Sequence, residues 1–170
     1  MPILACIPQA VKALQDLGMH RKVQLIVSGG IRTGADVAKA MALGADAVAI
    51  GTAALIALGD NDPKWESEYQ KLGTTADAYD DWHEGRDPAG ITTQDPELMK
   101  RFDPILGGRR LKNYLKVMTL EAQTIARACG KNHLHNLEPE DLCSLTIEAA
   151  AMAGVPLAGT NWIPGRNGGF

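Results

Sequence analysis

The most regular pattern of hydrophobic and polar positions lies between Val23 and Thr52. It begins with a short, largely β-branched run to Val27, which predicts a strand covered on both faces. A helical pattern follows, and a second apolar run from Ala47 to Ile50 predicts another strand. The apolar face of the helix consists of small and medium-sized residues, Val37, Ala40, Met41 and Gly44. This order predicts a strand–helix–strand unit with parallel strands.

Each predicted strand ends in a glycine turn, Ser28-Gly29-Gly30 after the first and Gly51-Thr52 after the second. Glycine lets the backbone turn tightly and approach a ligand. Thr33 and Asp36 have the spacing of a capping box at the start of the helix. Two such turns at the ends of parallel strands, beside a helix N-terminus, would point several N–H donors at one spot. The pattern therefore predicts an anion site, with phosphate as the usual ligand.

Six residues are candidates for this phosphate site: Ser28, Gly29, Gly30, Arg32, Gly51 and Thr52. Arg32 is favoured because a guanidinium group binds phosphate through two parallel hydrogen bonds. Ser28 is either a turn residue or a partner for a ribityl or ribose hydroxyl. In (β/α)8 barrels the loops after strands seven and eight commonly form a phosphate site, and the spacing of the two turns fits that geometry. The alternative is an ordinary βαβ unit whose glycines only relieve tight turns.

The same periodicity, read together with Asp-Pro and glycine punctuation, predicts further helices. They cover residues 7–17, 53–58, 62–73, 95–102, 109–129 and 139–153. The first is expected to bury Ile7, Val11, Leu14 and Leu17, and the last Leu142, Leu145, Ala149 and Met152.

The chain divides into three segments that differ in composition and in predicted secondary structure. Residues 1–59 hold the strand–helix–strand unit, and residues 60–108 are rich in Asp, Gly, Pro and Thr, with an irregular loop from Asp80 to Thr93. Residues 109–170 form a helical extension with a turn-rich tail. We expect the loop to be functional or interfacial because it is too long for a simple connector.

The composition of the chain mainly argues against certain classes of partner and location. The chain has 170 residues, 45% hydrophobic and 22% charged, with a net charge of −3, as is usual for one soluble domain. Mild acidity and few aromatic residues give no reason to expect nucleic acid or a membrane surface as a partner. The N-terminus does not resemble a signal peptide, and the apolar run over residues 47–58 is too short to span a bilayer, so a cytoplasmic location is the default.

Cysteine and histidine offer little metal chemistry. Cys6, Cys129 and Cys143 lack any C-x-x-C spacing, which predicts reduced, packed thiols. His133 and His135 are two residues apart, a spacing that can bind a metal ion, but no third ligand is evident. We therefore interpret the two histidines as structural and assign no metal site and no catalytic residue.

Several motifs resemble known families. The Gly-Gly-Ile-Arg turn followed by Gly-Ala-Asp-Ala-Val resembles FMN-dependent barrel enzymes and also the inosine-monophosphate dehydrogenase family. Residues 51–59 and 88–98 resemble the FMN-barrel domain of glutamate synthases. The stretches DDWHEGRDPAG, HNLEPEDL and TIEAAAMAGVPLAGTNWIPG resemble the large, glutamate-synthase-like subunit of N-methylglutamate synthases. The resemblance covers nearly the whole chain but only the C-terminal part of such a subunit.

This resemblance implies an α/β fold. The chain would be the last βα units of a (β/α)8 TIM barrel of the FMN-dependent oxidoreductase type, followed by a helical C-terminal extension. A complete barrel usually needs about 250 residues. Only two strand signals precede Gly51, so the barrel is expected to be incomplete and the chain a fragment or split-gene piece.

The resemblance also implies a function. The parent protein would use FMN to reduce an imine formed from 2-oxoglutarate and ammonia or methylamine, giving glutamate or N-methylglutamate. Its expected partners are the missing N-terminal barrel half and other synthase subunits, in an oligomer. One alternative is a non-catalytic truncated subunit that serves as an interaction module. Another is a nucleotide-phosphate barrel of the inosine-monophosphate dehydrogenase type, ranked last because no cysteine nucleophile follows the glycine turns.

The chain departs from glutamate synthases in one motif. Those proteins carry three cysteines before PxGIxTQDPEL that hold an iron–sulfur cluster. Aligned by that motif, the three places hold Ala76, Trp82 and Asp87, none of which supplies a thiolate. We therefore predict that this loop binds no cluster and that His83 beside it is a packed or solvated loop residue.

Overall fold

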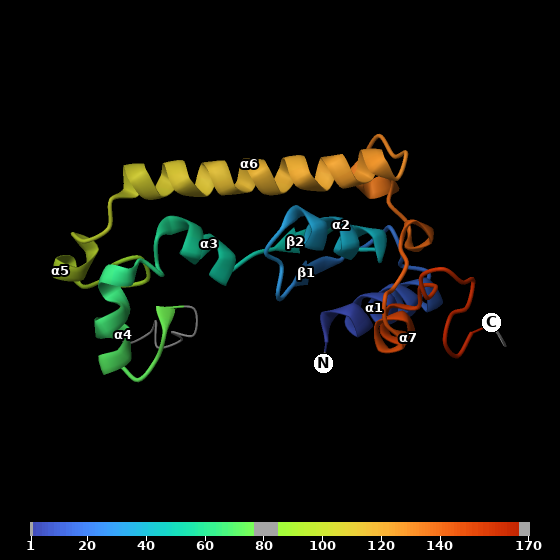
Figure 1. Ribbon diagram of the computed structural model, residues 1–170, viewed down its shortest axis with the longest axis horizontal. Helices are drawn as coiled ribbons and strands as arrows, with labels where there is room; N and C mark the ends of the chain where they lie inside the picture. The colour runs from blue at the N-terminus through green and yellow to red at the C-terminus, as the bar shows by residue number, and fades with distance from the viewer. Residues whose placement is uncertain (1, 77–84, 167–170) are drawn as a thin grey trace. The chain divides into compact units, whose positions relative to one another are not determined.

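A computed structural model describes residues 2–76 and 85–166 and shows an α/β chain with one small parallel sheet (Figure 1). It divides into two compact units, one formed by residues 1–50 and 118–170 and the other by residues 51–117. The regular elements are α1 (Ile3–Asp16), β1 (Ile26–Ser28), α2 (Gly34–Ala42), β2 (Ala47–Ala49), α3 (Thr52–Leu58), α4 (Glu66–Lys71), α5 (Pro96–Met99), α6 (Pro104–Ala128) and α7 (Ile147–Ala153), with 3₁₀ turns η1 (Pro63–Trp65), η4 (Leu134–Asn136) and η5 (Pro139–Asp141).

The first unit contains the predicted strand–helix–strand unit with parallel strands. Ser28 of β1 lies opposite Ala49 of β2, and the carboxylate of Asp46 accepts the N–H of Leu25 at 2.7 Å just before the paired residues. Both strands have only three residues. The first begins later than the apolar run because the N–H of Val23 is bound in a local turn.

The expectation that the strands are covered on both faces is wrong for this chain. Val27 is buried by the helices, whereas the side chain of Ile26, which points to the other face, is 64% exposed. Because neighbouring side chains of a strand alternate between faces, this difference means that one face of the sheet is open.

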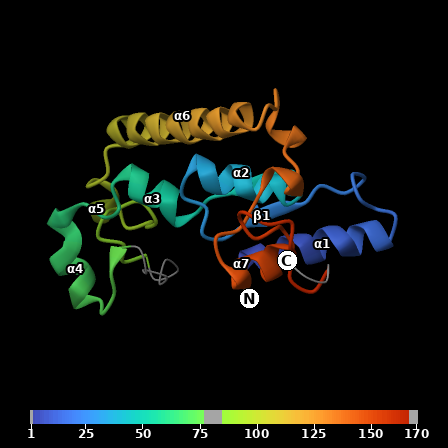
Figure 2. The same ribbon diagram turned by 45° about the vertical axis from the view of Figure 1, so that its right-hand side comes forward.

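Helices α1 and α7 lie side by side, as the views in Figures 1 and 2 both show, and close the covered side of the sheet. Helix α1 begins four residues before the predicted start and continues through Pro8. Leu17 is not on its buried face: it follows the last helical turn and is exposed. The core residues of this layer are Ile7, Val27, Ile31, Ala40, Leu43, Ala45, Ala153 and Val155.

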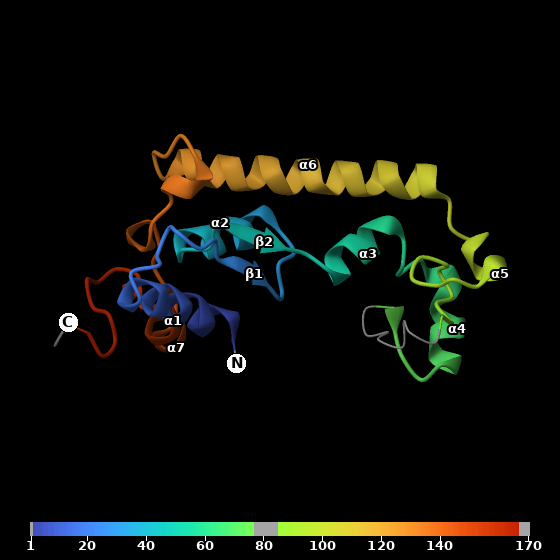
Figure 3. The same ribbon diagram turned by 180° about the vertical axis from the view of Figure 1, so that it is seen from behind.

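Helix α2 packs against the part of α6 that belongs to the same unit (Figure 3). Small residues make this contact close: Gly34, Ala38 and Ala42 recur every four residues along one side of α2. A Cβ atom added to Gly34 would lie 2.3 Å from the carbonyl oxygen of Met118, well inside van der Waals contact. We call this contact the α2–α6 seam.

The second unit contains the elements that begin with an Asp-Pro pair. The side chain of Asp62 accepts the N–H of Lys64, and that of Asp95 accepts the N–H groups of the first turn of α5, as predicted. The predicted helix over residues 62–73 is instead a 3₁₀ turn followed by the separate helix α4. Helix α6 begins five residues before the predicted start because Asp103 caps it in the same way.

The single helix predicted over residues 139–153 is wrong. The 3₁₀ turn η5 is followed by a β-bridge between Ser144 and Leu157, and α7 begins only after Thr146, whose hydroxyl accepts the N–H of Ala149 at 3.2 Å. Leu145 is consequently 87% exposed, while Ala150 is fully buried. A threonine cap inside the apolar pattern is what divides this segment.

Two further observations concern cysteines and membranes. Cys6 and Cys129 are half-buried free thiols, but Cys143 is exposed, so the expectation of a packed thiol is wrong there. None of the helices in the described part of the chain is both long and apolar enough to cross a membrane.

Candidate functional site

The first glycine turn directly follows β1. Gly29 and Gly30 have φ angles of +124° and +68°, in the region that favours glycine because it has no Cβ atom. A Cβ atom on Gly30 would meet no atom within 4 Å, so the turn borders open space. Ser28, Gly29 and Gly30 are all exposed. The turn can therefore be approached by a ligand from solvent.

The predicted capping box at the start of α2 is present. The Asp36 carboxylate accepts the N–H groups of Arg32 and Thr33, both at 3.1 Å, and the Thr33 hydroxyl accepts the N–H of Asp36 at 3.2 Å. Partial burial raises the pKa of Asp36, but these N–H donors and the ammonium of Lys39 outweigh it and leave the pKa below its usual range. The cap is therefore ionised at neutral pH.

Glu121 of α6 binds the next donor of this helix start. Its Oε2 atom accepts the N–H of Gly34 at 2.7 Å. The N–H groups of Arg32, Thr33 and Gly34 are therefore bound within the protein and are not offered to an anion. Of the residues predicted for the phosphate site, the glycine turn and Arg32 are exposed in this unit. Glu121 was missed because no local pattern connects residues 87 positions apart.

The second glycine turn begins the other unit. Gly51 precedes the first turn of α3 and Thr52 is the first residue of this helix, and both are exposed. Because the two turns belong to different units, their meeting on one phosphate stays a prediction.

A buried polar node holds the loop after residue 85 in the second unit. The Asp87 carboxylate accepts the Tyr69 hydroxyl at 2.8 Å and the N–H groups of Ala89, Ile91 and Thr92 at 3.0, 2.7 and 2.7 Å. Tyr69 also lies 2.8 Å from a carboxylate oxygen of Asp60. We call these residues the Asp87 node.

The node is structural. Burial raises the pKa of Asp87, but its N–H and hydroxyl donors outweigh this and leave the pKa below the usual range. Burial and the two carboxylates raise the pKa of Tyr69 far above its ordinary value, so Tyr69 stays a donor. Four hydrogen bonds fill the lone-pair positions of the Asp87 carboxylate, which leaves no oxygen to bind a metal. Among the other aligned places Ala76 offers no ligand, and Trp82 lies, with His83, outside the described residues.

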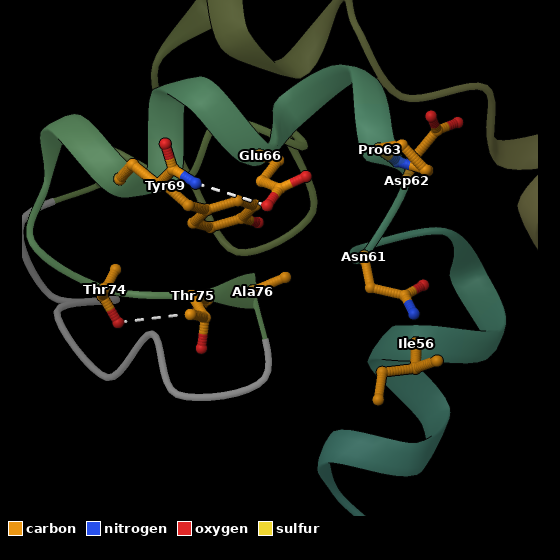
Figure 4. A pocket seen from close by; sticks show the side chains of 10 residues that line it. Ile56, Asn61, Asp62, Pro63, Glu66, Tyr69, Thr74, Thr75 and Ala76 are labelled. Atoms are coloured by element: carbon orange, nitrogen blue, oxygen red, sulfur yellow. Dashed lines mark hydrogen bonds between the residues drawn. The ribbon is translucent and has the colours of Figure 1, made fainter.

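A pocket of about 360 Å³ lies beside this node, between α4 and the end of α3 (Figure 4). Glu66 and Gln70 of α4 bind each other on its wall, at 3.3 Å, and Asn61 and Ile56 lie opposite. These groups form no constellation of nucleophile and base, so the pocket adds no catalytic candidate.

His133 and His135 have the structural roles expected of them. The His133 ring accepts the N–H of His135 and caps η4, and the His135 ring bonds the Asp46 carbonyl oxygen at 2.9 Å. In the residues that the structure describes, no three His, Cys, Asp or Glu side chains gather at one point.

A βαβ unit with an open, left-handed glycine turn at the end of its first strand places the chain among α/β proteins. The family model described as "Conserved region in glutamate synthase" matches residues 1–63 and 76–132, more than half of the chain. The chain therefore belongs to the glutamate synthase family.

Individual proteins similar to this chain carry names of the same family. The chain is 86% identical over 166 residues to a "Glutamate synthase large subunit-like protein" of Rhizobium meliloti, covering 98% of this chain and 38% of that protein. It is 40% identical over 137 residues to an "Archaeal glutamate synthase [NADPH]" of Methanocaldococcus jannaschii, covering 81% of this chain and 24% of the relative. A "Ferredoxin-dependent glutamate synthase 1" of Arabidopsis thaliana is 30% identical over 71% of the chain. No solved structure matches.

Proposed function

We propose that this chain forms the FMN-phosphate-binding end of a glutamate-synthase-like (β/α)8 barrel, with β1 and β2 as its last two strands. The observation that supports this most directly is the open glycine turn after β1, with Arg32 exposed beside it, in a member of the glutamate synthase family. The chain spans only 38% and 24% of the two relatives first described. The rest of the barrel would cover the open face of the sheet at Ile26.

The residues present suit a phosphate monoester. Backbone N–H groups of a left-handed glycine turn form a concave donor surface, and a guanidinium adds a bidentate charged contact. Ser28 can bond a ribityl hydroxyl next to the phosphate. In the second unit Gly51 and Thr52 would complete the clamp. The role of this chain is to bind and orient FMN, not to supply a catalytic side chain.

Membership of the glutamate synthase family supports the proposed activity. FMN supplies hydride-transfer chemistry when bound, and the protein positions it. The proposed substrate is the imine of 2-oxoglutarate with ammonia or methylamine, which gains one hydride and one proton to become glutamate or N-methylglutamate. The residues that touch the imine would lie on strands outside this chain, and further synthase subunits would supply the electrons.

Replacing Arg32 by alanine tests the phosphate site. In the full-length protein we expect Arg32→Ala to weaken FMN binding by about 1.5–3 kcal/mol, the range for a hydrogen bond to a charged group. Fluorescence titration of the apoprotein with FMN measures this change. Lys39→Ala is the matched control, because Lys39 is an exposed cation of α2 that pairs with Asp36. Equal FMN affinity in the Arg32 variant and the wild type would contradict the proposed site.

The isolated chain provides a second test. Because the sheet face at Ile26 is open, we expect the 170-residue chain to self-associate and to bind FMN only weakly. Light scattering and flavin titration measure the two properties, and Ile26→Asp should reduce self-association. A monomer that binds FMN with micromolar affinity, about −8 kcal/mol, would show that no further strands are needed.

A further inference from the structure

A small pocket of about 190 Å³ lies at the C-terminal end of α6, in the first unit. Its polar lining comes from the last turns of α6 and the segment that leads to η4, and consists of Gln123, Arg127, Lys131, Asn132, His133 and His135. Among the described residues, no Asp or Glu side chain lines it. The pocket is separate from the proposed FMN-phosphate site: His135 bonds the Asp46 carbonyl oxygen beyond the end of α2, whereas Arg32 precedes the start of that helix.

Hydrogen bonds within the protein occupy acceptors of this lining and leave donors for a ligand. The Oδ1 atom of Asn132 accepts a side-chain N–H of Asn136 at 2.8 Å, so the amide nitrogen of Asn132 remains as a donor. The Nδ1 atom of His133 accepts the N–H of His135 at 3.2 Å, so the His133 ring carries its proton on Nε2 and donates from there. Asn132 and His133 therefore bring N–H groups to the pocket.

Arg127 gives the pocket its positive charge. The ammonium group of Lys131 is balanced by the carboxylates of Glu138 at 3.3 Å and Asp141 at 3.4 Å. Arg127 is exposed and makes no ion pair within the part of the chain that the structure describes. None of the residues three or four positions away from it is acidic, so it lacks the usual partner on its own helix. The guanidinium charge is therefore left for a ligand.

The end of α6 opposes an anion only weakly. Unpaired carbonyl groups at a helix C-terminus repel negative charge, but those of Ile125, Ala126 and Arg127 accept backbone N–H groups of the turn that follows. The pocket is smaller than the about 300–1,000 Å³ of sites that enclose a drug-sized ligand, so it fits one small group. We propose that it binds a small oxyanion, a phosphate or a carboxylate, through the Arg127 guanidinium and the N–H groups of Asn132 and His133.

Equilibrium dialysis of the full-length protein against radiolabelled inorganic phosphate tests this site, with the ionic strength held constant by chloride. Arg127→Gln should weaken phosphate binding about tenfold or more, because a hydrogen bond between charged groups is lost. Asn132→Asp nearly preserves the shape of the pocket but adds a carboxylate, and it should abolish binding. Competition by acetate would support a site shared by carboxylates, and its failure to compete would support a site restricted to phosphate.

Two control variants locate the effect. Arg109→Gln makes the same change at another exposed arginine of α6, outside the pocket lining, and should bind phosphate like the wild type. Arg32→Ala should also leave this phosphate binding unchanged, so the test does not depend on the proposed FMN site. The proposal is overturned if Arg127→Gln binds phosphate like the wild type. It is also overturned if Arg109→Gln weakens binding as much as Arg127→Gln does, since net charge alone would then attract the anion.

Discussion

Replacing Asp87 by alanine is expected to lower the free energy of unfolding by roughly 3 kcal/mol or more. The substitution leaves three N–H groups of the following loop without their acceptor, at about 1–3 kcal/mol for each buried donor left unpaired. The Tyr69 hydroxyl loses one of its two acceptors and keeps Asp60. Urea unfolding followed by circular dichroism measures the loss.

Three comparisons isolate the cause. Asp87→Asn keeps the shape and one acceptor oxygen, so its loss should be smaller. Asp16→Ala removes an exposed carboxylate paired with the exposed Lys12 and should change stability by less than about 0.5 kcal/mol. Since the pKa of Asp87 is lowered by folding, its contribution is complete above about pH 4 and is lost as the pH falls toward the folded-state pKa. An Asp87→Ala protein as stable as the wild type would show that the node is not structural.

Replacing Gly34 by alanine should open the α2–α6 seam. The added methyl group would lie 2.3 Å from the carbonyl oxygen of Met118 and 2.5 Å from the backbone nitrogen of Ala122. Both are backbone atoms, so the helices must separate, and the hydrogen bond from Gly34 to Glu121 must lengthen. We expect a loss of about 3 kcal/mol, at the upper end of the usual range for overpacking, measured as a lower midpoint of thermal unfolding.

The matched control is Gly108→Ala in α6. Gly108 lies inside this helix, and a Cβ atom there meets nothing within 4 Å. Alanine should therefore stabilise the helix by up to about 1 kcal/mol, the opposite sign to Gly34→Ala. If both variants show the same gain, α2 and α6 are not in close contact at Gly34.

The features of the fold that could be predicted from the sequence are those determined by residues close together in the chain. The capping box at Thr33 and the caps at Asp62 and Asp95 are encoded within three residues, and the structure contains all three. The same logic places the start of α6 at Asp103 and of α7 at Thr146, two caps that the apolar period does not reveal. Prediction from hydrophobic periodicity alone therefore misplaced the starts of helices whose first residue is determined by a local cap.

The candidate site shows which features could not be predicted from the sequence. Its glycines adopt the positive φ angles that the sequence favoured, but whether the N–H groups beside them are free depends on Glu121, far along the chain. The node between Tyr69 and Asp87 is likewise a contact between separate segments. Hydrogen bonds between distant segments cannot be recognised from the periodicity of the sequence, because each partner looks like an ordinary surface residue in its own segment.

The open face at Ile26 has a practical consequence for handling the protein. An apolar strand with an unpaired edge can serve as a template for another copy, the first step toward fibrous aggregates. Two exposed cations, Arg21 and Lys22, lie a few residues before this strand, and like charges brought together by in-register stacking repel. Salt shortens the range of that repulsion to about 3 Å at 1 M ionic strength. We therefore expect concentrated stocks to keep best in dilute buffer and to turn cloudy in high salt.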